Sequence, residues 1–306
     1  MPRREGNIVD TILITGATGY IGRHLVARLV ARGARPRCLS RPGSWQRALP
    51  EGTESVVGDL GDPASLEAAT KDVTAIVHLA AVVANLKQTK AVSYRGVNDE
   101  GTANLVRAAR HSGVAHFVHL GGLNTIPGGA NSYIRTRYNG EQHVRTGGIP
   151  YSILQPSILF GDGSQFFTTL ADLARRSPIL PVPGNGQLRF QPIWVEDVVT
   201  CLLALLNEGG RDETVGVGGP AYYTYDQLLD LIGAKIGKRR PKLHVPLPLV
   251  TPGAAVMERL LPHPPVTLAA LELFAGGDNV TSLDSVPARF GFQPRSLEEQ
   301  MRGQGF

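Results

Sequence analysis

Short apolar segments alternate with longer segments of helical period along the first half of the chain. The apolar segments are rich in Val and Ile and predict strands at residues 11–15, 35–40, 55–58, 75–79, 117–120 and 151–155. Between them apolar residues recur at helical spacing, as at Ile21, Leu25 and Leu29, with Gly33 as a stop signal. Successive strands joined by helices are parallel with right-handed crossovers. The pattern therefore predicts an α/β protein with a doubly wound parallel sheet and helices on both faces.

The rhythm changes after Pro156. Gly- and Pro-rich loops follow. The sequence then predicts helices at 196–207 and 225–237 with a strand between them at 214–217, and an apolar, Pro-rich stretch at 243–274 comes last. We therefore expect two domains. Residues 1–156 would form the sheet, and residues 157–306 a smaller α+β lobe for a substrate or partner, partly threaded back onto the sheet.

Three glycines follow the first predicted strand, in the sequence TGATGYIG at residues 15–22. Gly16 permits a sharp turn, Gly19 lets the backbone approach a pyrophosphate, and Gly22 lets the next helix pack close to the sheet. Because a strand precedes this loop and an amphipathic helix follows it, the motif predicts a Rossmann-type dinucleotide site. The alternative is a glycine-rich turn that binds nothing.

The end of the second predicted strand indicates which dinucleotide is preferred. Sites specific for NAD carry Asp or Glu about 20 residues after the glycine loop, where the carboxylate binds the ribose hydroxyls. This chain has Ser40 and Arg41 there, a hydroxyl and a guanidinium that suit a 2′-phosphate. We expect NADP (NADPH) as the cofactor in preference to NAD. The alternative is that Arg41 is a solvated surface residue.

Composition excludes several classes of protein. The 306 residues include 31 Lys plus Arg against 26 Asp plus Glu, and 42% are hydrophobic, as in a folded protein. The basic residues form no blocks, so nucleic acid is not an expected partner. Cys38 and Cys201 cannot build a disulfide framework or a zinc site, and no metal is expected. No apolar run approaches the roughly 18 residues of a spanning helix, and residues 1–10 carry no apolar signal segment, so a cytoplasmic location is expected.

Several motifs resemble those of the extended, or atypical, short-chain dehydrogenase/reductase superfamily of the NAD-dependent epimerase/dehydratase type. Besides TGATGYIG these motifs are GDLGD at 58–62, HLAA at 78–81, VNDEGTANLV at 97–106 and QPSILFG at 155–161. The resemblance covers nearly the whole chain. Residues 131–199, which include YIRTRYNGE and PGNGQLRFQPIWVEDVV, are most similar to the branch of the nucleotide-binding accessory subunit of respiratory complex I.

The resemblance implies a set of cofactor contacts. Asp59 and Leu60 would meet the adenine, Ala80 and Ala81 would line the ribose and nicotinamide, and Asn98 would support the site from its helix. The alternative for Asp59 is a carboxylate that only caps a turn. The other cofactor-binding residues that the resemblance implies are Thr18, Tyr20, Ile21, Leu79, Tyr133, Arg137, Gln155 and Pro156.

The histidines in the predicted strands are not expected to be catalytic or metal-binding residues. His78 lies within the fourth predicted strand and is expected to be a core histidine with satisfied hydrogen bonds. His116 and His119 lie three positions apart, an odd offset on a strand, so they should point to opposite faces of the sheet and hold no metal together.

The catalytic residues depart from the superfamily pattern. Active members use a Tyr, a Lys four residues later on the same helix face, and a Ser or Thr at the end of the fifth strand. Here Tyr133 is followed by Arg137, and Gly121 and Gly122 stand where serines are usual. Arginine keeps the positive charge that stabilises a phenolate, but its planar fork is bulkier than an ammonium. Thr125 is a candidate for the missing hydroxyl, which makes Tyr133, Arg137 and Thr125 the candidate catalytic residues. The alternative is a Tyr133 that packs over the nicotinamide ribose without chemistry.

Two functions fit these residues, and whether the chain is an enzyme stays open between them. One is an NADP-preferring oxidoreductase or epimerase of attenuated or unusual chemistry, acting on a small carbonyl or a quinone- or isoprenoid-like ligand. The other is a non-catalytic accessory or assembly protein of a respiratory or quinone-linked complex. Arg189 lies one residue out of the spacing found in nucleotide-sugar enzymes, which argues against such a substrate.

The stretch 245–274 bears on the second function. Its only charged residues are Glu258, Arg259 and Glu272, so exposure to water would be unfavourable. Its prolines are expected to break it into short helical pieces at 254–261 and 266–274. The pieces would either cover the substrate cleft as part of the core or dock on a membrane protein or apolar ligand, which would make the protein peripheral to a membrane.

Overall fold

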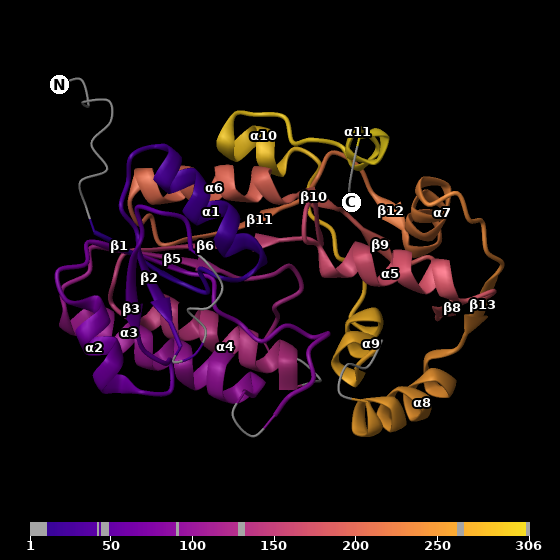
Figure 1. The fold of residues 1–306 in the computed structure, drawn as a ribbon, viewed down its shortest axis with the longest axis horizontal. Helices are drawn as coiled ribbons and strands as arrows, with labels where there is room; N and C mark the ends of the chain where they lie inside the picture. Colours follow the sequence, from indigo (N-terminus) through magenta and orange to yellow (C-terminus); the bar gives the residue numbers. More distant parts are fainter. Residues whose placement is uncertain are drawn as a thin grey trace.

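A computed structural model describes residues 11–41, 43, 49–89, 92–127, 132–261 and 266–303 of the chain. Its centre is a seven-stranded parallel sheet with the strand order β11-β6-β5-β4-β1-β2-β3 (Figure 1). The strands are β1 (Ile12–Thr15), β2 (Arg37–Ser40), β3 (Glu54–Val57), β4 (Ala75–His78), β5 (His116–Leu120), β6 (Tyr151–Pro156) and β11 (Glu213–Val217). The predicted doubly wound α/β fold is confirmed.

Helices cover both faces of this sheet. One face is covered by α1 (Tyr20–Ala31) and α6 (Val195–Glu208), and the other by α2 (Pro63–Thr70), α3 (Thr102–His111) and α4 (Ser132–Thr146) (Figure 1). A π-helical segment, η1 (Arg95–Gly101), leads into α3. Because both faces are covered, β1 and β4 are buried along their whole length, which explains their uninterrupted apolar sequences.

The chain leaves the sheet after β6 and returns to it with α6 and β11. The elements outside the sheet on the way are β7 (Leu159–Phe160), α5 (Gln165–Arg176), β8 (Leu180–Pro183), β9 (Arg189–Phe190) and β10 (Ile193–Trp194). After β11 follow β12 (Tyr223–Thr224), α7 (Tyr225–Lys235), β13 (Lys242–Val245), α8 (Leu247–Leu260), α9 (Leu268–Ala275), α10 (Ser285–Phe290) and α11 (Leu297–Arg302). Helices α5, α7 and α11 share a second core, rich in aromatic residues, with the short strand pairs β9–β12 and β8–β13.

Local signals in the sequence define several helix ends. The Asp62 carboxylate accepts a hydrogen bond from the amide of Ala64 and Pro63 takes the first position of α2. A capping box formed by Thr224 and Gln227 starts α7. Gly33, with φ of +79°, follows α1 and allows the left-handed turn that ends it.

The expectation that prolines divide the stretch 245–274 was wrong at Pro252, which lies inside α8. Pro252 provides no amide for the carbonyl of Pro248 one turn earlier, a loss that is costly in a buried helix. Here Pro248 and Pro252 are both exposed, so water can bind the free carbonyl. In the described part of the chain, no helix is both long and apolar enough to cross a membrane.

Candidate functional site

The loop between β1 and α1 has the geometry of a phosphate-binding turn. Gly16 has a φ of +72°, and a Cβ there would lie 2.7 Å from the amide nitrogen of Ala80 on the neighbouring strand end. A Cβ on Gly22 would lie 2.1 Å from the carbonyl oxygen of Gly16, so α1 approaches the loop as closely as glycine permits. Both positions require glycine for the reasons that the sequence predicts.

The N-terminus of α1 is open to an anion. Gly19 precedes the helix, is exposed and offers no side chain to cap it. The first turn of α1 contains no acidic residue, so its free amides and the positive end of the helix dipole are not neutralised from within the helix. Thr18 and Ile21 lie half-buried beside these amides, and the Tyr20 hydroxyl donates to the carbonyl of Gly161 at 3.3 Å.

The end of β2 presents the polar group that the sequence indicates. Ser40 is buried, and its hydroxyl has no hydrogen-bond partner among the described residues. Arg41 follows it and is exposed. A buried hydroxyl without a partner is unfavourable unless a ligand satisfies it, so this position fits a ribose or a phosphate attached to it.

Asp59 and Leu60 follow β3 on the same edge of the sheet. The Asp59 carboxylate accepts a hydrogen bond from the amide of Gly61 at 2.7 Å, so it does cap a turn, which was the alternative role. This turn uses only Oδ1 of the Asp59 carboxylate. Leu60 is buried, and its carbonyl accepts a hydrogen bond from the Asn104 side chain at 2.9 Å.

A buried hydrogen-bond network supports the loop after β4. The Thr102 hydroxyl donates to the carbonyl of Asn98 at 2.9 Å and therefore accepts from Nε2 of His78 at 3.0 Å. Nδ1 of His78 then accepts from the Thr15 hydroxyl at 2.6 Å, and Thr15 in turn accepts from the amide of Ala80 at 3.3 Å. His78 is thus a satisfied core histidine, as expected. It connects β1, β4 and α3 beneath the loop that begins at Leu79.

Asn98 fixes the other end of the same loop. Its side-chain oxygen accepts from the amide of Val82 at 2.8 Å, and its side-chain nitrogen donates to the Val82 carbonyl at 2.9 Å. Ala80 and Ala81 lie half-buried between the two anchored ends.

The buried histidines remain neutral. Burial, and secondarily the Arg137 charge, lowers the pKa of His78 to about 3. His119 lies next to it, with ring centroids 5.1 Å apart, and burial lowers its pKa well below the usual value. His116 faces α6 on the opposite side of the sheet, near Leu206. The described residues contain no cluster of His, Cys, Asp or Glu that could hold a metal ion.

Tyr133 and Arg137 lie one turn apart on α4. Tyr133 is half-buried and its ring meets that of Tyr94 edge to face, with centroids 5.4 Å apart. Arg137 is 9% exposed and its Nη2 donates to the carbonyl of Leu120 at 2.7 Å. The guanidinium is therefore held by the end of β5.

The loop after β5 differs from the superfamily pattern in a way that the structure explains. A Cβ on Gly121 would lie 2.4 Å from Oε1 of Glu141, so a serine does not fit there. Gly122 has open space, and the nearest atom to its Cβ would be the Thr125 hydroxyl at 4.0 Å. That hydroxyl donates to the carbonyl of Gly122 at 2.7 Å, so its proton is already used in the turn.

A buried carboxylate behind this loop was not found from the sequence. Glu141 is completely buried in α4 and accepts hydrogen bonds from Nε2 of Gln155 at 2.9 and 3.0 Å. Arg145, one turn later, pairs with it at 2.7 Å. The spacing of Glu141 and Arg145 suggests an ordinary surface pair, and the signal that could have revealed the cluster is Gln155 at the end of a buried strand. Gln155 is thus bound to α4, while Pro156 next to it is buried.

Helix α9 forms an apolar wall beside Tyr133. Ala269 and Leu273 of α9 pack in one cluster with Tyr94 and Tyr133. Thr267 begins α9 and its hydroxyl donates to the carbonyl of Ala84, in the loop after β4. Part of the apolar stretch therefore belongs to the candidate site, as one of the two alternatives predicts.

Arg189 and two acidic residues of the second lobe are engaged in structural contacts. Arg189 pairs with Asp278 at 2.6 Å and holds the pKa of that carboxyl below its usual value. Glu196 and Asp197 lie in the first turn of α6, where acidic residues favour the helix dipole. Glu196 pairs with His24 and Arg28, and buried Asp197 accepts from the amide of Arg295 at 2.7 Å.

Comparison with known proteins identifies the family. Residues 12–218 match the model of the NAD dependent epimerase/dehydratase family. The chain belongs to that family. It is 32% identical over 251 residues to a ceramide reductase of Caulobacter vibrioides, covering 80% of this chain and 77% of the relative. The expected extended short-chain dehydrogenase/reductase is confirmed, and the glycine loop is that of a dinucleotide-binding protein.

Two further matches extend this result. The chain is 29% identical over 271 residues to the 40 kDa subunit of the mitochondrial NADH-ubiquinone oxidoreductase of Neurospora crassa, covering 86% of this chain and 70% of the relative. The crystal structure of gox2253 matches with a TM-score of 0.76 and 25% identity, over 95% of this chain and 96% of that one. The resemblance to the complex I branch is therefore confirmed, within an epimerase/dehydratase fold.

Proposed function

We propose that this member of the epimerase/dehydratase family binds NADP(H) in preference to NAD(H) and is a slow oxidoreductase of apolar carbonyl compounds. The observation that carries the cofactor preference is the end of β2, where the buried Ser40 hydroxyl lacks a partner and Arg41 follows it. Sites with strong NAD specificity carry an Asp or Glu at this position, and this chain has neither there. A 2′-phosphate would accept from both side chains.

The residues around the glycine loop fit the rest of the dinucleotide. The open N-terminus of α1 would receive the pyrophosphate, and the loop from Leu79 to Val82, fixed by His78 and Asn98, would support the nicotinamide ribose. A bound nicotinamide supplies or accepts a hydride. Every other part of the reaction depends on the side chains at the ends of β5 and α4.

Tyr133 is the group best placed to exchange a proton with a substrate oxygen. Arg137, one turn later, supplies the positive charge that stabilises a phenolate, yet its Nη2 is bound to the Leu120 carbonyl at 2.7 Å. No hydroxyl stands at Gly121 or Gly122 to bind the substrate oxygen, and the Thr125 hydroxyl proton is used in its turn. These three features support slow turnover.

The walls beside Tyr133 support an apolar substrate. Tyr94, Val82, Ala84 and Leu273 gather around its ring. The ceramide reductase from Caulobacter vibrioides is named for a lipid, which agrees with such a wall. A long apolar carbonyl compound is therefore the substrate class that we propose, rather than a nucleotide sugar.

A second candidate function is a nucleotide-binding accessory subunit. It is favoured by the restrained Arg137 and by the similarity to the complex I subunit. The test is calorimetric titration of the purified protein with NADPH and with NADH, followed by incubation of the NADPH complex with aliphatic, steroid and quinone carbonyls while nicotinamide absorbance is recorded. Turnover that Tyr133→Phe abolishes supports the enzyme. Tight NADPH binding without turnover on any carbonyl supports the accessory role, and equal affinities for the two nucleotides overturn the NADP preference.

A further inference from the structure

Helix α8 is exposed to an unusual degree for an apolar helix. Of its fourteen residues, from Leu247 to Leu260, only Ala254 is buried. Leu249, Val256 and Leu260 are 71%, 56% and 73% exposed. Their spacing of seven and four residues places them in one stripe along the helix.

The opposite side of α8 attaches it to the protein. The Glu258 carboxylate accepts a hydrogen bond from the amide of Leu268 at 2.8 Å, at the start of α9. Lys87 donates to the carbonyls of Arg259 and Leu261, at 3.3 and 3.0 Å, and so binds the end of the helix to the loop after β4. The helix is thus held in place while its apolar stripe faces outward. Packing in the protein core does not explain this apolar stripe, because its side chains are exposed.

A basic loop precedes the same segment of chain. Residues 236–241 connect α7 to β13, and β13 leads directly into α8 (Figure 1). Four basic residues at this end of the lobe have no acidic partner among the described residues: Arg176, Lys238, Arg239 and Arg240. The loop carries net positive charge, and Leu243, two residues after it in β13, is 56% exposed.

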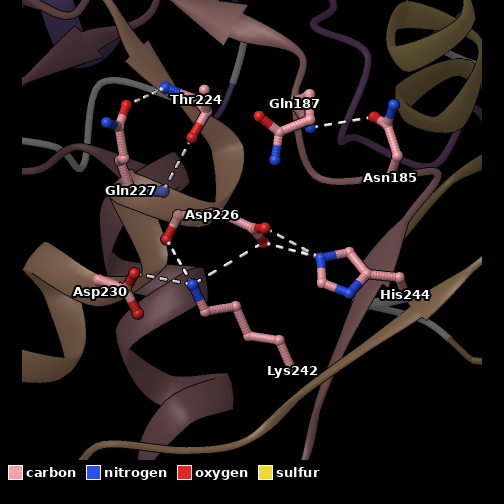
Figure 2. A network of polar contacts seen from close by, with 8 residues as sticks. All are labelled: Asn185, Gln187, Thr224, Asp226, Gln227, Asp230, Lys242 and His244. Carbon is pink, nitrogen blue, oxygen red and sulfur yellow. Dashed lines mark hydrogen bonds and ion pairs between the residues drawn. The ribbon is translucent and has the colours of Figure 1, made fainter.

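The loop is anchored at its start by the amide of Lys238, which donates to the carbonyl of Gly233 at 2.9 Å, and at its end by the contacts of β13. Figure 2 shows Lys242 between two carboxylates of α7, 2.8 Å from Asp230 and 3.9 Å from Asp226. His244 binds the second oxygen of Asp226 at 2.9 Å. These contacts hold β13 against α7 and neutralise Lys242. They leave the charges of Arg239 and Arg240 uncompensated.

A cavity of about 350 Å³ opens between Arg239, Arg240 and Lys242, with Leu180 and Leu229 in its wall. Two guanidinium groups with spare donors are the usual partners of a phosphate group. The cavity contains one carboxylate, Asp230, which is occupied by Lys242. Its free charge therefore suits an anion.

We propose that α8 and the basic loop form a docking surface for an anionic phospholipid bilayer. The stripe of Leu249, Val256 and Leu260 would enter the boundary between headgroups and acyl chains, as amphipathic interfacial helices do. Arg239 and Arg240 would bind lipid phosphates. A second copy of the chain fits less well, since pairing the two surfaces would bring like charges together.

This surface goes beyond the proposed function and does not depend on it. Helix α8 packs on α9, and α9 packs beside Tyr133. Docking would therefore place the apolar wall of the candidate site close to the bilayer. The proposal nevertheless concerns binding only, and it is measured without substrate or nucleotide.

The experiment is co-sedimentation of the full chain with vesicles of phosphatidylcholine alone and with vesicles of equal parts phosphatidylcholine and phosphatidylglycerol. We expect binding to the anionic vesicles that falls as ionic strength rises, because salt screens the basic residues. A basic residue near an anionic surface contributes about fivefold to partitioning, so Arg239→Glu with Arg240→Glu should weaken binding by at least about 25-fold. Equal binding to neutral and anionic vesicles, or no binding to either, overturns the proposal.

The apolar part has its own variant. Leu249→Glu with Leu260→Glu should lower partitioning about tenfold or more, since two leucines no longer enter the bilayer. Both side chains are more than two-thirds exposed, so the thermal unfolding midpoint should hardly change. If the leucine double variant unfolds, the proposal is tested by the Arg239→Glu and Arg240→Glu double variant alone. If either folded double variant binds the anionic vesicles as strongly as the wild type does, the proposal is contradicted.

Matched controls lie elsewhere on the molecule. Leu283→Glu changes a leucine that is 42% exposed, two residues before α10. Figure 1 shows α10 and α8 at opposite edges of the molecule. Arg35→Glu with Arg107→Glu alters net charge as much as the loop variant does, at two exposed positions of the sheet domain. Both controls should keep wild-type vesicle binding. Equal loss in a control and in the loop variant shows that only net charge matters and overturns the docking surface.

Discussion

Nη2 of Arg137 donates a hydrogen bond to the main-chain carbonyl of Leu120 at 2.7 Å, which joins α4 to the last residue of β5. Active members of the superfamily have a lysine at the position of Arg137. A lysine ammonium is a compact charge on a flexible stem, whereas the guanidinium presents a planar fork that bonds in fixed directions. The arginine thus stabilises the strand end and is restrained by it. The charge stays near the candidate site while its freedom to act on a ligand is reduced.

Restoring the usual residues should raise turnover. We expect Gly122→Ser with Arg137→Lys to increase the rate on an aliphatic carbonyl with NADPH at least about tenfold, because general acid–base groups typically contribute 10²–10⁴. A serine at 122 has room, since the nearest atom to its Cβ is 4.0 Å away. Adding Tyr133→Phe should remove the gain. Calorimetry should show little change in NADPH affinity.

A matched control separates chemistry from folding. Gly121→Ser adds the same hydroxyl one residue earlier, where its Cβ would lie 2.4 Å from Oε1 of Glu141. We expect that variant to lose stability and gain no activity. A wild-type enzyme that turns over rapidly and is unaffected by Tyr133→Phe would show that another residue performs the proton transfer.

Cofactor preference should depend on the end of β2. A charge-assisted hydrogen bond contributes about 1.5–3 kcal/mol, so NADPH should bind at least about tenfold more tightly than NADH. Arg41→Asp should abolish this preference, and Ser40→Ala should reduce it, both measured by calorimetry. Arg35→Asp is the control, because Arg35 is exposed near the other end of the same strand. An unchanged preference in Arg41→Asp would assign the 2′-phosphate to other residues.

Much of the sheet domain was predictable because its signals are local. The strand before Gly16 and the helix after it are encoded within about twenty residues, so spacing alone indicates the phosphate loop. The position of Ser40 and Arg41 at the end of β2 follows from the same reasoning, since it is counted from the loop. These features need no knowledge of distant contacts.

Other parts depend on contacts between distant residues. Glu141 and Gln155 are brought together only when α4 packs against β6, and Tyr94 meets Tyr133 only after η1 and α4 are placed. The apolar stretch was ambiguous for the same reason, because composition does not say which face is covered. The structure divides it, with Leu271 of α9 only 3% exposed and Leu260 of α8 73% exposed. Hydrophobicity is equal in the two residues, and packing alone distinguishes them.

Glycine should be required at position 16 because a side chain there would clash with its neighbours. Gly33, which has a similar positive φ but no close neighbours, separates this clash from backbone strain. Gly16→Ala places a Cβ 2.7 Å from the amide of Ala80 in a backbone with φ of +72°. We expect about 2–4 kcal/mol loss in the free energy of unfolding and loss of nucleotide binding. Gly33→Ala introduces the same strain, at φ of +79°, with nothing within 4 Å of its Cβ. It should cost about 1 kcal/mol and leave binding intact. Similar losses from both variants in urea unfolding would show that backbone strain, not the close approach of Leu79 and Ala80, accounts for the effect.

The buried histidines should make the protein less stable as the pH falls below about 6.5. Burial lowers the pKa of His78 to about 3 and that of His119 well below its usual value, so both stay neutral in the folded state. The unfolded chain binds protons on them first, and their contribution to stability is complete above about pH 6.5 and is lost as the pH decreases. Each contributes a slope of about 1.4 kcal/mol per pH unit in that window, with His116 acting in the same direction.

Urea unfolding at several pH values between about 7.5 and 5 measures this slope for wild type and for His119→Phe, in which one of the protons can no longer be taken up. The phenyl ring also removes the buried Nδ1 of His119, which has no partner among the described residues. We therefore expect a shallower slope, reduced by about 1.4 kcal/mol per pH unit, without a large loss of stability at neutral pH. His111→Gln, at an exposed position of α3, is the control and should keep the wild-type slope. An identical slope in wild type and His119→Phe would mean that His119 is protonated in the folded protein, which its burial beside His78 and Arg137 opposes.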